Sequence, residues 1–250
     1  MLDNKINLLG YDVSTLPIKD IVTKALSKGG TYVVNTINPH SYVEAKKDYE
    51  FNKALLHSDI LIPDGSGISL AAKVLKKVSL KKIAGFDLFQ ETMRQLNETN
   101  GTVFFLGSTN EVLLDIKKNA KNDYPNVQVE LLSPPYKAVF EQSDIDSFIS
   151  EINKNNIDVL FVGLTAPKQE KLIEAIKGKI NVKMVSGIGA VFDFYAGHVV
   201  RPSQIWLTLH LEWLIRFIGE PKRLWRRNFI STPIFLKDLG INKILLLRNK

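Results

Sequence analysis

Two kinds of hydrophobic pattern alternate along the chain. Short, mostly apolar and β-branched runs predict strands at residues 31–35, 59–62, 102–106, 127–132, 158–162 and 182–186. Between them, apolar residues at helical spacing predict helices at residues 41–57, 66–77, 86–99, 109–123, 143–155 and 167–178. Apolar strands separated by helices are typical of a parallel sheet covered on both faces. We therefore predict an α/β fold, with residues 6–13 as an extra hairpin at one sheet edge.

The last fifth of the chain has a different pattern. Helical stretches are expected at residues 203–219, 222–229 and 234–247, and prolines at positions 202, 221 and 233 lie at their boundaries. We interpret residues 1–200 as the α/β domain and residues 201–250 as a helical appendage.

The distribution of charge separates the same two regions. Residues 1–200 carry 23 Lys and Arg and 23 Asp and Glu, whereas residues 201–250 carry 10 against 3, so the net charge of +7 lies entirely in the appendage. All three tryptophans, Trp206, Trp213 and Trp225, lie there as well. A neutral body with a basic, Trp-containing end predicts an anionic partner, for which nucleic acid and a membrane surface are the two candidates.

Several classes of protein are excluded by composition. The chain has no cysteine, which excludes structural disulfides and thiolate metal sites. Its start has no long apolar core behind a basic stretch, and no run of 18 apolar residues occurs anywhere. We therefore expect no signal peptide and no membrane-spanning segment, and a cytoplasmic location.

Small and polar residues follow most of the predicted strands. In open α/β sheets ligands bind beyond the carboxyl ends of the strands, where backbone N–H groups of Gly and Ser can approach a phosphate. One such loop alone would be an ordinary strand-to-helix turn. Five together favour a ligand site, although none matches a known phosphate-loop or dinucleotide spacing. The loops are residues 35–40, 63–67, 107–109, 163–170 and 187–197.

Two aspartates in these loops have two interpretations each. Asp64 directly follows the apolar run 60–63 and precedes Gly65, so its carboxylate is expected at the sheet rim. It could act there as a general base on a sugar hydroxyl, or it could cap the next helix. Asp193 lies inside an apolar stretch and could contact a donor substrate or bind backbone, with the structural role favoured.

A third acidic motif resembles a metal site. Asp144-Ile145-Asp146 matches the Asp-x-Asp pattern of many sugar-nucleotide transferases. It opens a helical stretch, however, where Asp residues cap the first turn and favour the helix dipole. We therefore expect no essential divalent metal and no cofactor.

The appendage contains two further patterns. Trp206, Leu209, Trp213 and Phe217 fall on one helical face, which would pack on the body or on another copy of the chain in a homo-oligomer. The cluster Lys222–Arg227 interleaves Trp225 with four cations, as suits anionic headgroups or a diphosphate. Nucleic acid is disfavoured as the partner, because no nucleic-acid reading motif accompanies the cluster.

These motifs occur together in one known family. The stretches are TINPH (36–40), SDILIPDGSG (58–67), GFDL (85–88), FLGS (105–108), VGLTAPKQE (162–170), GIGAVFDFYAG (187–197), LEWL (211–214) and EPKRLWRR (220–227). By these the chain resembles the WecG/TagA/CpsF family of bacterial glycosyltransferases, in family order from about residue 30 to about residue 230.

The resemblance implies an inverting transferase with a Rossmann-like fold at the inner face of the membrane. It implies a UDP-sugar donor, most often N-acetylmannosamine or its uronic acid, and N-acetylglucosamine on undecaprenyl diphosphate as acceptor. It also implies that the products feed teichoic acid or other surface polysaccharides. Asp64 takes the position of the candidate base, with Thr36 beside it as the second catalytic candidate. The expected substrate-binding residues are Asn38, Lys82, Gly107, Ser108, Gly163, Gln169, Gly187, Gly189, Asp193, Arg216, Arg223 and Arg226.

Some residues depart from the family pattern. Lys82 stands where many members have arginine, and lysine lacks the bidentate fork that binds phosphate. His40 and Ser66 also differ from the commonest forms. Another donor sugar, glucosyl or mannosyl, in exopolysaccharide synthesis therefore stays an alternative. Two other hypotheses also stay open: a non-catalytic nucleotide-binding module that docks on membranes, because the loops alone do not separate binding from turnover, and an RNA-binding protein that uses the basic tail.

Overall fold

The computed structural model describes residues 4–27, 29–199, 206, 212–219 and 221–248. Its strands are β1 (Lys5–Leu8), β2 (Tyr11–Ser14), β3 (Tyr32–Ile37), β4 (Ile60–Pro63), β5 (Thr102–Gly107), β6 (Gln128–Leu132), β7 (Val159–Gly163) and β8 (Met184–Gly187). The helices of the body are α1 (Ile18–Ser27), α2 (Pro39–Ala45), α3 (Tyr49–Leu56), α4 (Ser66–Ala71), α5 (Gly85–Thr99), α6 (Asn110–Asp123), α7 (Gln142–Asn153), α8 (Lys168–Ile176) and α9 (Val191–Ala196). A π-helical turn, η1 (Ala72–Lys76), extends α4.

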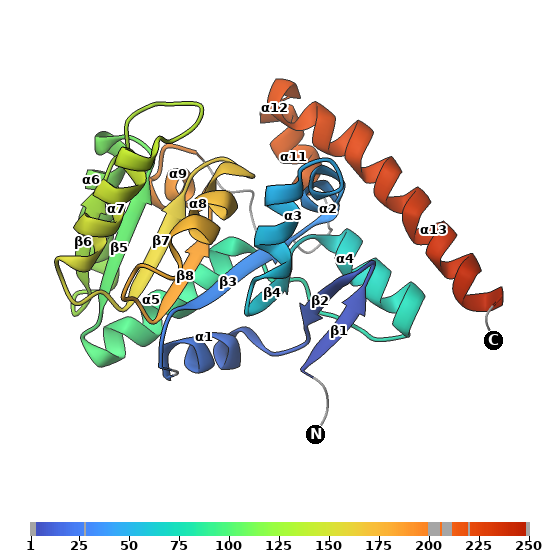
Figure 1. The fold of residues 1–250 in the computed structure, drawn as a ribbon, viewed down its shortest axis with the longest axis horizontal. Coiled ribbons are helices and arrows are strands. Elements are labelled where there is room, and N and C mark those ends of the chain that lie inside the picture. Colours follow the sequence, from blue (N-terminus) through green and yellow to red (C-terminus); the bar gives the residue numbers. More distant parts are fainter. Residues whose placement is uncertain (1–3, 28, 200–205, 207–211, 220, 249–250) are drawn as a thin grey trace.

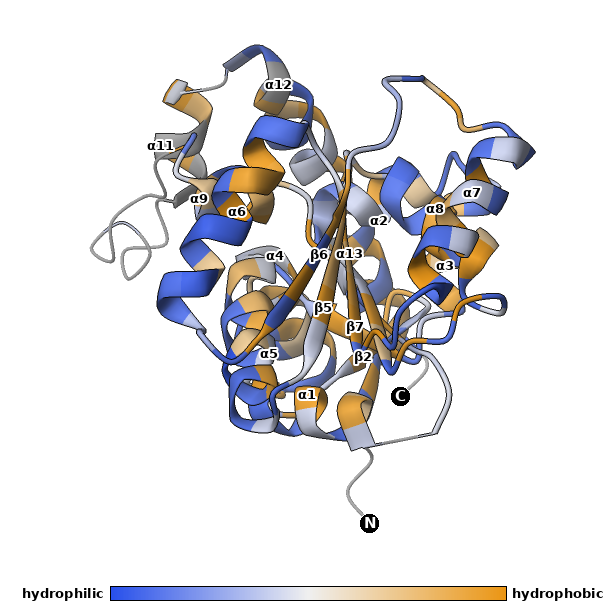
Figure 2. Ribbon diagram, turned by 90° about the vertical axis from the view of Figure 1, so that its left-hand side faces the viewer, coloured by the Kyte–Doolittle hydropathy of each residue, from blue (hydrophilic) through white to orange (hydrophobic). Residues whose placement is uncertain are grey.

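The strands form one sheet in the order β1-β2-β4-β3-β8-β7-β5-β6 (Figure 1). Only the β1–β2 pair is antiparallel among these neighbours, so the predicted parallel sheet and the hairpin at its edge are both confirmed. Helices cover both faces of the sheet (Figure 2), so most residues of its central strands are apolar and buried.

Three apolar clusters hold these layers together. On one face, α1, α5, α6 and α9 pack on the sheet through residues such as Ile21, Phe89 and Phe192. On the other face, α7 and α8 pack through Phe148 and Ile173. A third cluster lies under α2, α3, α4 and η1, at the end of the sheet that carries the hairpin.

The strand order opens a crevice between β3 and β8. The chain leaves β3 toward the face where α3 contacts α8, and it leaves β8 toward the opposite face, where α9 contacts α6. Connections that diverge from adjacent strands leave room for a ligand at the carboxyl ends. The predicted loops after β3 and β8 are therefore neighbours.

The appendage is helical, as expected. It contains α11 (Glu212–Gly219), α12 (Pro221–Trp225), the π-helical turn η2 (Arg226–Ser231) and α13 (Thr232–Arg248), and α13 runs along the outside of α2 and α4 (Figure 1). Phe235 and Leu239 of α13 are buried in the third cluster. The division of the chain into two domains at residue 200 stays a prediction.

Some predicted boundaries were wrong. The expected helix 41–57 is two helices. The first, α2, ends at Ala45, and Asp48 then accepts a hydrogen bond from the Phe51 backbone N–H and caps α3. Helices α1 and α9 were not predicted. The expected stop before Pro233 is absent, because the widened turn η2 precedes it, with the Thr232 N–H bonded to the Arg227 carbonyl. Of the stretch 203–211, only Trp206 lies within the described residues.

Candidate active site

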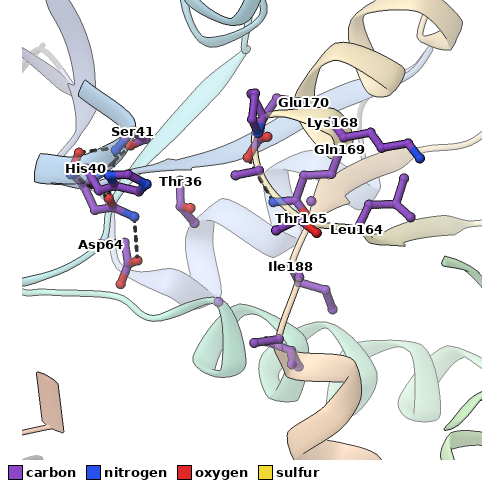
Figure 3. Close-up of a pocket in the computed structure, with 18 of the residues that line it drawn as sticks. Thr36, His40, Ser41, Asp64, Leu164, Thr165, Lys168, Gln169, Glu170 and Ile188 are labelled. Carbon is purple, nitrogen blue, oxygen red and sulfur yellow. Dashed lines mark hydrogen bonds between the residues drawn. The ribbon is translucent and has the colours of Figure 1, made fainter. Parts of the chain in front are cut away.

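One large cleft lies at the carboxyl ends of the strands. Its volume is about 1700 Å³, and its lining comes from the loops after β3, β4, β5, β6, β7 and β8 and from η2 and α13. In Figure 3, Asp64 and His40 lie on one side and Gln169 and Lys168 on the other, with Thr36 between them. The sheet thus brings most of the predicted residues together. Those that line the cleft are Thr36, Asn38, Asp64, Lys82, Ser108, Gly163, Gln169, Gly187, Gly189 and Asp193.

Asp64 is held in place by the neighbouring loop. Because β3 pairs with β4 in parallel, with Ile37 opposite Pro63, the residues after the two strands emerge side by side. The Asp64 backbone N–H donates to the Ile37 carbonyl at 2.8 Å, and its side-chain Oδ2 accepts from Asn38 Nδ2 at 3.3 Å. The N-cap residue of α4 is Gly65, and no side-chain hydrogen bond caps this helix, so the capping interpretation of Asp64 was wrong.

The orientation of the Asn38 amide follows from its second contact. Its Oδ1 accepts hydrogen bonds from the backbone N–H groups of His40 and Ser41, both at 3.0 Å, and so caps α2. With the oxygen fixed on the helix, the amide N–H₂ must face the carboxylate. Asn38 therefore connects the start of α2 to the position of Asp64.

Across the cleft, Gln169 and Glu170 lie in the first turn of α8 and are both buried. Gln169 Nε2 donates to Glu170 Oε1 at 2.9 Å. Gln169 Oε1 and Glu170 Oε2 have no hydrogen-bond partner among the described residues. Burial raises the pKa of the Glu170 carboxyl, so it keeps its proton to a higher pH than an exposed glutamate. Glu170 was not among the predicted site residues, although it lies in the PKQE stretch.

Glycines at the strand ends make room for neighbouring groups. A Cβ on Gly187 would lie 2.7 Å from Cδ of Gln169, and one on Gly163 would lie 2.4 Å from the Phe192 ring. Gly107 is not among the residues that line the cleft, and its contact with substrate stays a prediction. The φ of Gly107 is +141°, and a Cβ placed on it would lie 2.4 Å from the Gly163 carbonyl oxygen on the neighbouring strand. Close packing of the two strands therefore requires glycine at this position.

Two other predicted residues flank the centre. The Ile83 N–H donates to the Pro63 carbonyl at 2.9 Å, which places Lys82 beside the end of β4. Asp193 lies in the first turn of α9. The carbonyl of Ser108 accepts a hydrogen bond from Ser133 Oγ at 2.8 Å, and Thr109 caps α6, a helix of 14 residues whose N-terminus faces the cleft.

The appendage forms another wall of the cleft, through residues that include Leu224, Arg227, Asn228 and Phe229. Arg226 does not line it. Its guanidinium lies 3.4 Å from Glu44 of α2 instead. The side chains of Arg216 and Arg223 lie outside what the structure describes. Arg227 was part of the basic cluster but was not selected from the sequence, because helical phase across η2 decides which arginine turns inward.

His40 connects the appendage to α2 at the edge of the cleft. Its Nδ1 lies 2.8 Å from Ser231 Oγ, so α2 and η2 are joined next to Asn38. Burial lowers the pKa of His40, Arg227 and Arg226 lower it further, and Glu44 opposes them. His40 is therefore neutral at neutral pH.

Asp144 has the structural role expected for it. Its carboxylate accepts from the Glu141 N–H at 2.9 Å and pairs with Lys137 at the start of α7. Within the described part of the chain, no three His, Asp or Glu side chains are grouped to hold a metal ion. No described helix is both long and apolar enough to cross a bilayer.

Comparison with known proteins agrees with this arrangement. The sequence profile of the glycosyl transferase WecG/TagA/CpsF family matches residues 6–248. The chain belongs to this family. It is therefore a glycosyltransferase.

Relatives in three species bear one name, N-acetylglucosaminyldiphosphoundecaprenol N-acetyl-beta-D-mannosaminyltransferase. The Bacillus spizizenii protein is 30% identical over 83% of this chain and 77% of its own length. The Bacillus subtilis protein is 29% identical over 80% and 76%. A Staphylococcus aureus protein is 25% identical over 94% and 92%.

Proposed function

We propose that this glycosyltransferase moves N-acetylmannosamine from UDP to N-acetylglucosamine carried on a polyprenyl diphosphate, for a cell-surface polymer. The names of the relatives support the acceptor and the transferred sugar. The observation that carries the proposal is the carboxylate of Asp64, oriented by Asn38 at the edge of a cleft large enough for two substrates.

In this proposal Asp64 is the general base. Its Oδ1 accepts no hydrogen bond from the described residues, and it takes the proton of the acceptor hydroxyl. The hydroxyl oxygen attacks C1 of the donor sugar from the face opposite the diphosphate. The C1–O bond to UDP breaks, and its electron pair leaves with the β-phosphate. One displacement inverts the anomeric centre. Thr36 lies between Asp64 and Gln169 (Figure 3), and we assign it a contact with the reacting sugar.

The charge on the leaving diphosphate needs stabilisation, which we assign to the protein rather than to a divalent metal. Arg227 of η2, Lys82 beside β4 and the N-terminus of α6 all border the cleft. Cationic side chains and backbone N–H groups fixed in advance stabilise charge that develops in a transition state.

We further propose that the enzyme works at the inner face of the plasma membrane, bound peripherally through the appendage. The ring of Trp225 stacks on Phe229 with centroids 4.8 Å apart, and both side chains are about half exposed. Lys222 and Arg226 lie exposed in the same segment. Aromatic rings prefer the headgroup level, and each nearby cation adds about 1 kcal/mol at an anionic surface.

The test is a donor screen with a short-chain polyprenyl-diphosphate N-acetylglucosamine as acceptor. UDP-N-acetylmannosamine, its uronic acid, and UDP- and GDP-hexoses are offered in turn, and product is followed by mass. We expect turnover with the first donor, undiminished in chelator. Asp64→Asn should keep donor binding and lose about 10²–10⁴ in rate. Turnover of only another donor would overturn the substrate assignment. Near-normal activity of Asp64→Asn would overturn the mechanism.

A further inference from the structure

The loop between β6 and α7, residues 133–141, forms a wall of the cleft at the other end of the sheet from Asp64. Asp64 follows β4, whereas β6 is the edge strand beyond β3, β8, β7 and β5. The loop projects past the carboxyl ends of the strands (Figure 1). Pro134 and Tyr136 are among its residues that line the cleft, and the Tyr136 side chain is fully exposed. A loop this exposed needs specific contacts to keep one position.

The two ends of this loop are fixed by its neighbours in the chain and in the sheet. At its start, the Ser133 hydroxyl donates to the carbonyl of Ser108, which follows β5. At its end, the Phe140 ring packs edge-on against Phe148 of α7, with centroids 5.0 Å apart. These contacts join the loop to β5 and α7. The other side of the cleft, which carries Gln169, is reached through a different residue.

Lys168, the first residue of α8, connects the loop to that side. Its ammonium donates to the Lys137 carbonyl and lies 3.8 Å from the centroid of the Phe140 ring. In Figure 3 its side chain extends away from Thr36 and Gln169. Burial lowers the pKa of Lys168, and Asp144 opposes this shift. A carbonyl and an aromatic face both stabilise a cation that is partly withdrawn from water, so one ammonium holds two points of the loop.

The geometry of the proposed reaction places the nucleotide of the donor near this loop. The acceptor hydroxyl at Asp64 attacks C1 from the face opposite the diphosphate. The diphosphate and the nucleoside therefore extend from C1 away from Asp64, and the cleft continues in that direction to the ends of β5 and β6. The β6–α7 loop is the wall of the cleft at that end.

We propose that Lys168 is a positioning residue for the donor, because its ammonium holds the β6–α7 loop where the loop contacts the nucleotide. The inference rests on the proposed function and adds to it a residue that acts without touching the substrate. A loop fixed in advance avoids the entropy cost of ordering it when the donor binds. The loop contacts the nucleotide equally before and during the reaction, so loss of Lys168 should weaken donor binding and leave the chemical step unchanged.

The experiment compares three substitutions in α8. Lys168→Met removes the ammonium and keeps an unbranched apolar side chain. Lys168→Arg keeps a cation that can donate to a carbonyl and lie over a ring. Lys171→Met is the matched control, because Lys171 lies in the same helix but pairs with Asp48, the cap of α3, at 2.6 Å. Calorimetric titration with UDP gives the Kd without any acceptor. Turnover assays vary donor and acceptor separately, and urea unfolding shows whether each variant is folded.

We expect Lys168→Met to raise the Kd of UDP and the KM of the donor by about tenfold, since it loses a charged hydrogen bond and a cation–π contact. Its kcat and its KM for the acceptor should stay within about twofold of the wild type. Lys168→Arg should recover most of the donor affinity, and Lys171→Met should match the wild type. Phe140→Leu, which removes the aromatic face, should act in the same direction as Lys168→Met and replaces it if that variant does not fold.

Three results would overturn the role of Lys168: unchanged UDP affinity in the folded variants, an equal loss in Lys171→Met, or a loss confined to kcat. Recovery by Lys168→Arg would separate the role of the cation from a general loosening of α8. If the wild type itself binds no UDP, the proposed function fails, and the role of Lys168 fails with it.

Discussion

Replacement of Asn38 by Asp separates the two roles of this residue. In the wild type Asn38 caps α2 through Oδ1 and donates through Nδ2 to Asp64 at 3.3 Å. Aspartate caps a helix as well as asparagine does, and its charge favours the helix N-terminus. Capping by itself should therefore change the free energy of unfolding by less than about 1 kcal/mol. The donor to Asp64, however, becomes a second carboxylate, and repulsion between the two carboxylates lowers the free energy of unfolding at neutral pH.

The expected effect is on the pH dependence of the reaction. Two unit charges about 4 Å apart repel by about 1 kcal/mol in bulk water and by about 4 kcal/mol at an effective dielectric constant near 20. One pH unit corresponds to about 1.36 kcal/mol. The variant's carboxylate pair should therefore hold a proton to a higher pH, and the acidic limb of kcat/KM should move upward by about 0.7 to 3 pH units.

The assay is kcat/KM from pH 4 to pH 9, with urea unfolding of each variant at neutral pH. Asn38→Ser is the control, because serine also caps but carries no charge. It should lower activity without moving the acidic limb. If the limb of Asn38→Asp stays at the wild-type pH in a variant that urea unfolding shows to be folded, Asp64 is not the base that Asn38 orients. The same movement in Asn38→Ser would show that charge is not its cause.

Two further predictions concern stability. Phe235→Ala should lower the free energy of unfolding by about 3–5 kcal/mol, because the ring is fully buried and packs edge-on to Tyr42, with ring centroids 5.5 Å apart. Urea denaturation measures this loss. A loss of less than about 1 kcal/mol would mean that Phe235 does not anchor α13. Glu170→Gln should raise the free energy of unfolding more at pH 8 than at pH 4. Burial raises the folded-state pKa of Glu170, so wild-type stability falls as pH rises from the unfolded pKa toward the folded one, and Gln removes this loss. Equal effects of the substitution at both pH values, again in urea, would contradict this account.

The fold could be predicted where one pattern sufficed. Apolar runs located every strand, and their alternation with helices indicated a parallel sheet. Boundaries failed where a local contact overrode the pattern, as at Asp48, which restarts the helix after α2. Helix α9 was missed because its six residues lie between glycines and resemble a loop. Helix α1 carries buried Ile21, Val22 and Ala25 at helical spacing, so its signal was present in the sequence.

The candidate site was predictable as a set of loops but not as contacts. Residues after parallel strands gather at one edge whatever the strand order, which is why most of the selected residues line the cleft. To predict the hydrogen bond between Asn38 and Asp64, one must also know that β3 and β4 are neighbours in the sheet. Likewise, the inward turn of Arg227 rather than Arg226 depends on the phase of a π-helical turn, which single-residue patterns do not encode.

The seven residues of α2 connect the appendage to the proposed chemistry. At its start, Asn38 caps the helix and holds Asp64. Along its length, His40 meets Ser231, and Tyr42 donates to Asp238 of α13 at 3.1 Å. A short helix moves as one piece, because its backbone hydrogen bonds fix the relative positions of its residues. Docking of the appendage and orientation of the base therefore depend on the same element. A change at the α2–α13 contact should alter turnover as well as the binding of a lipid acceptor.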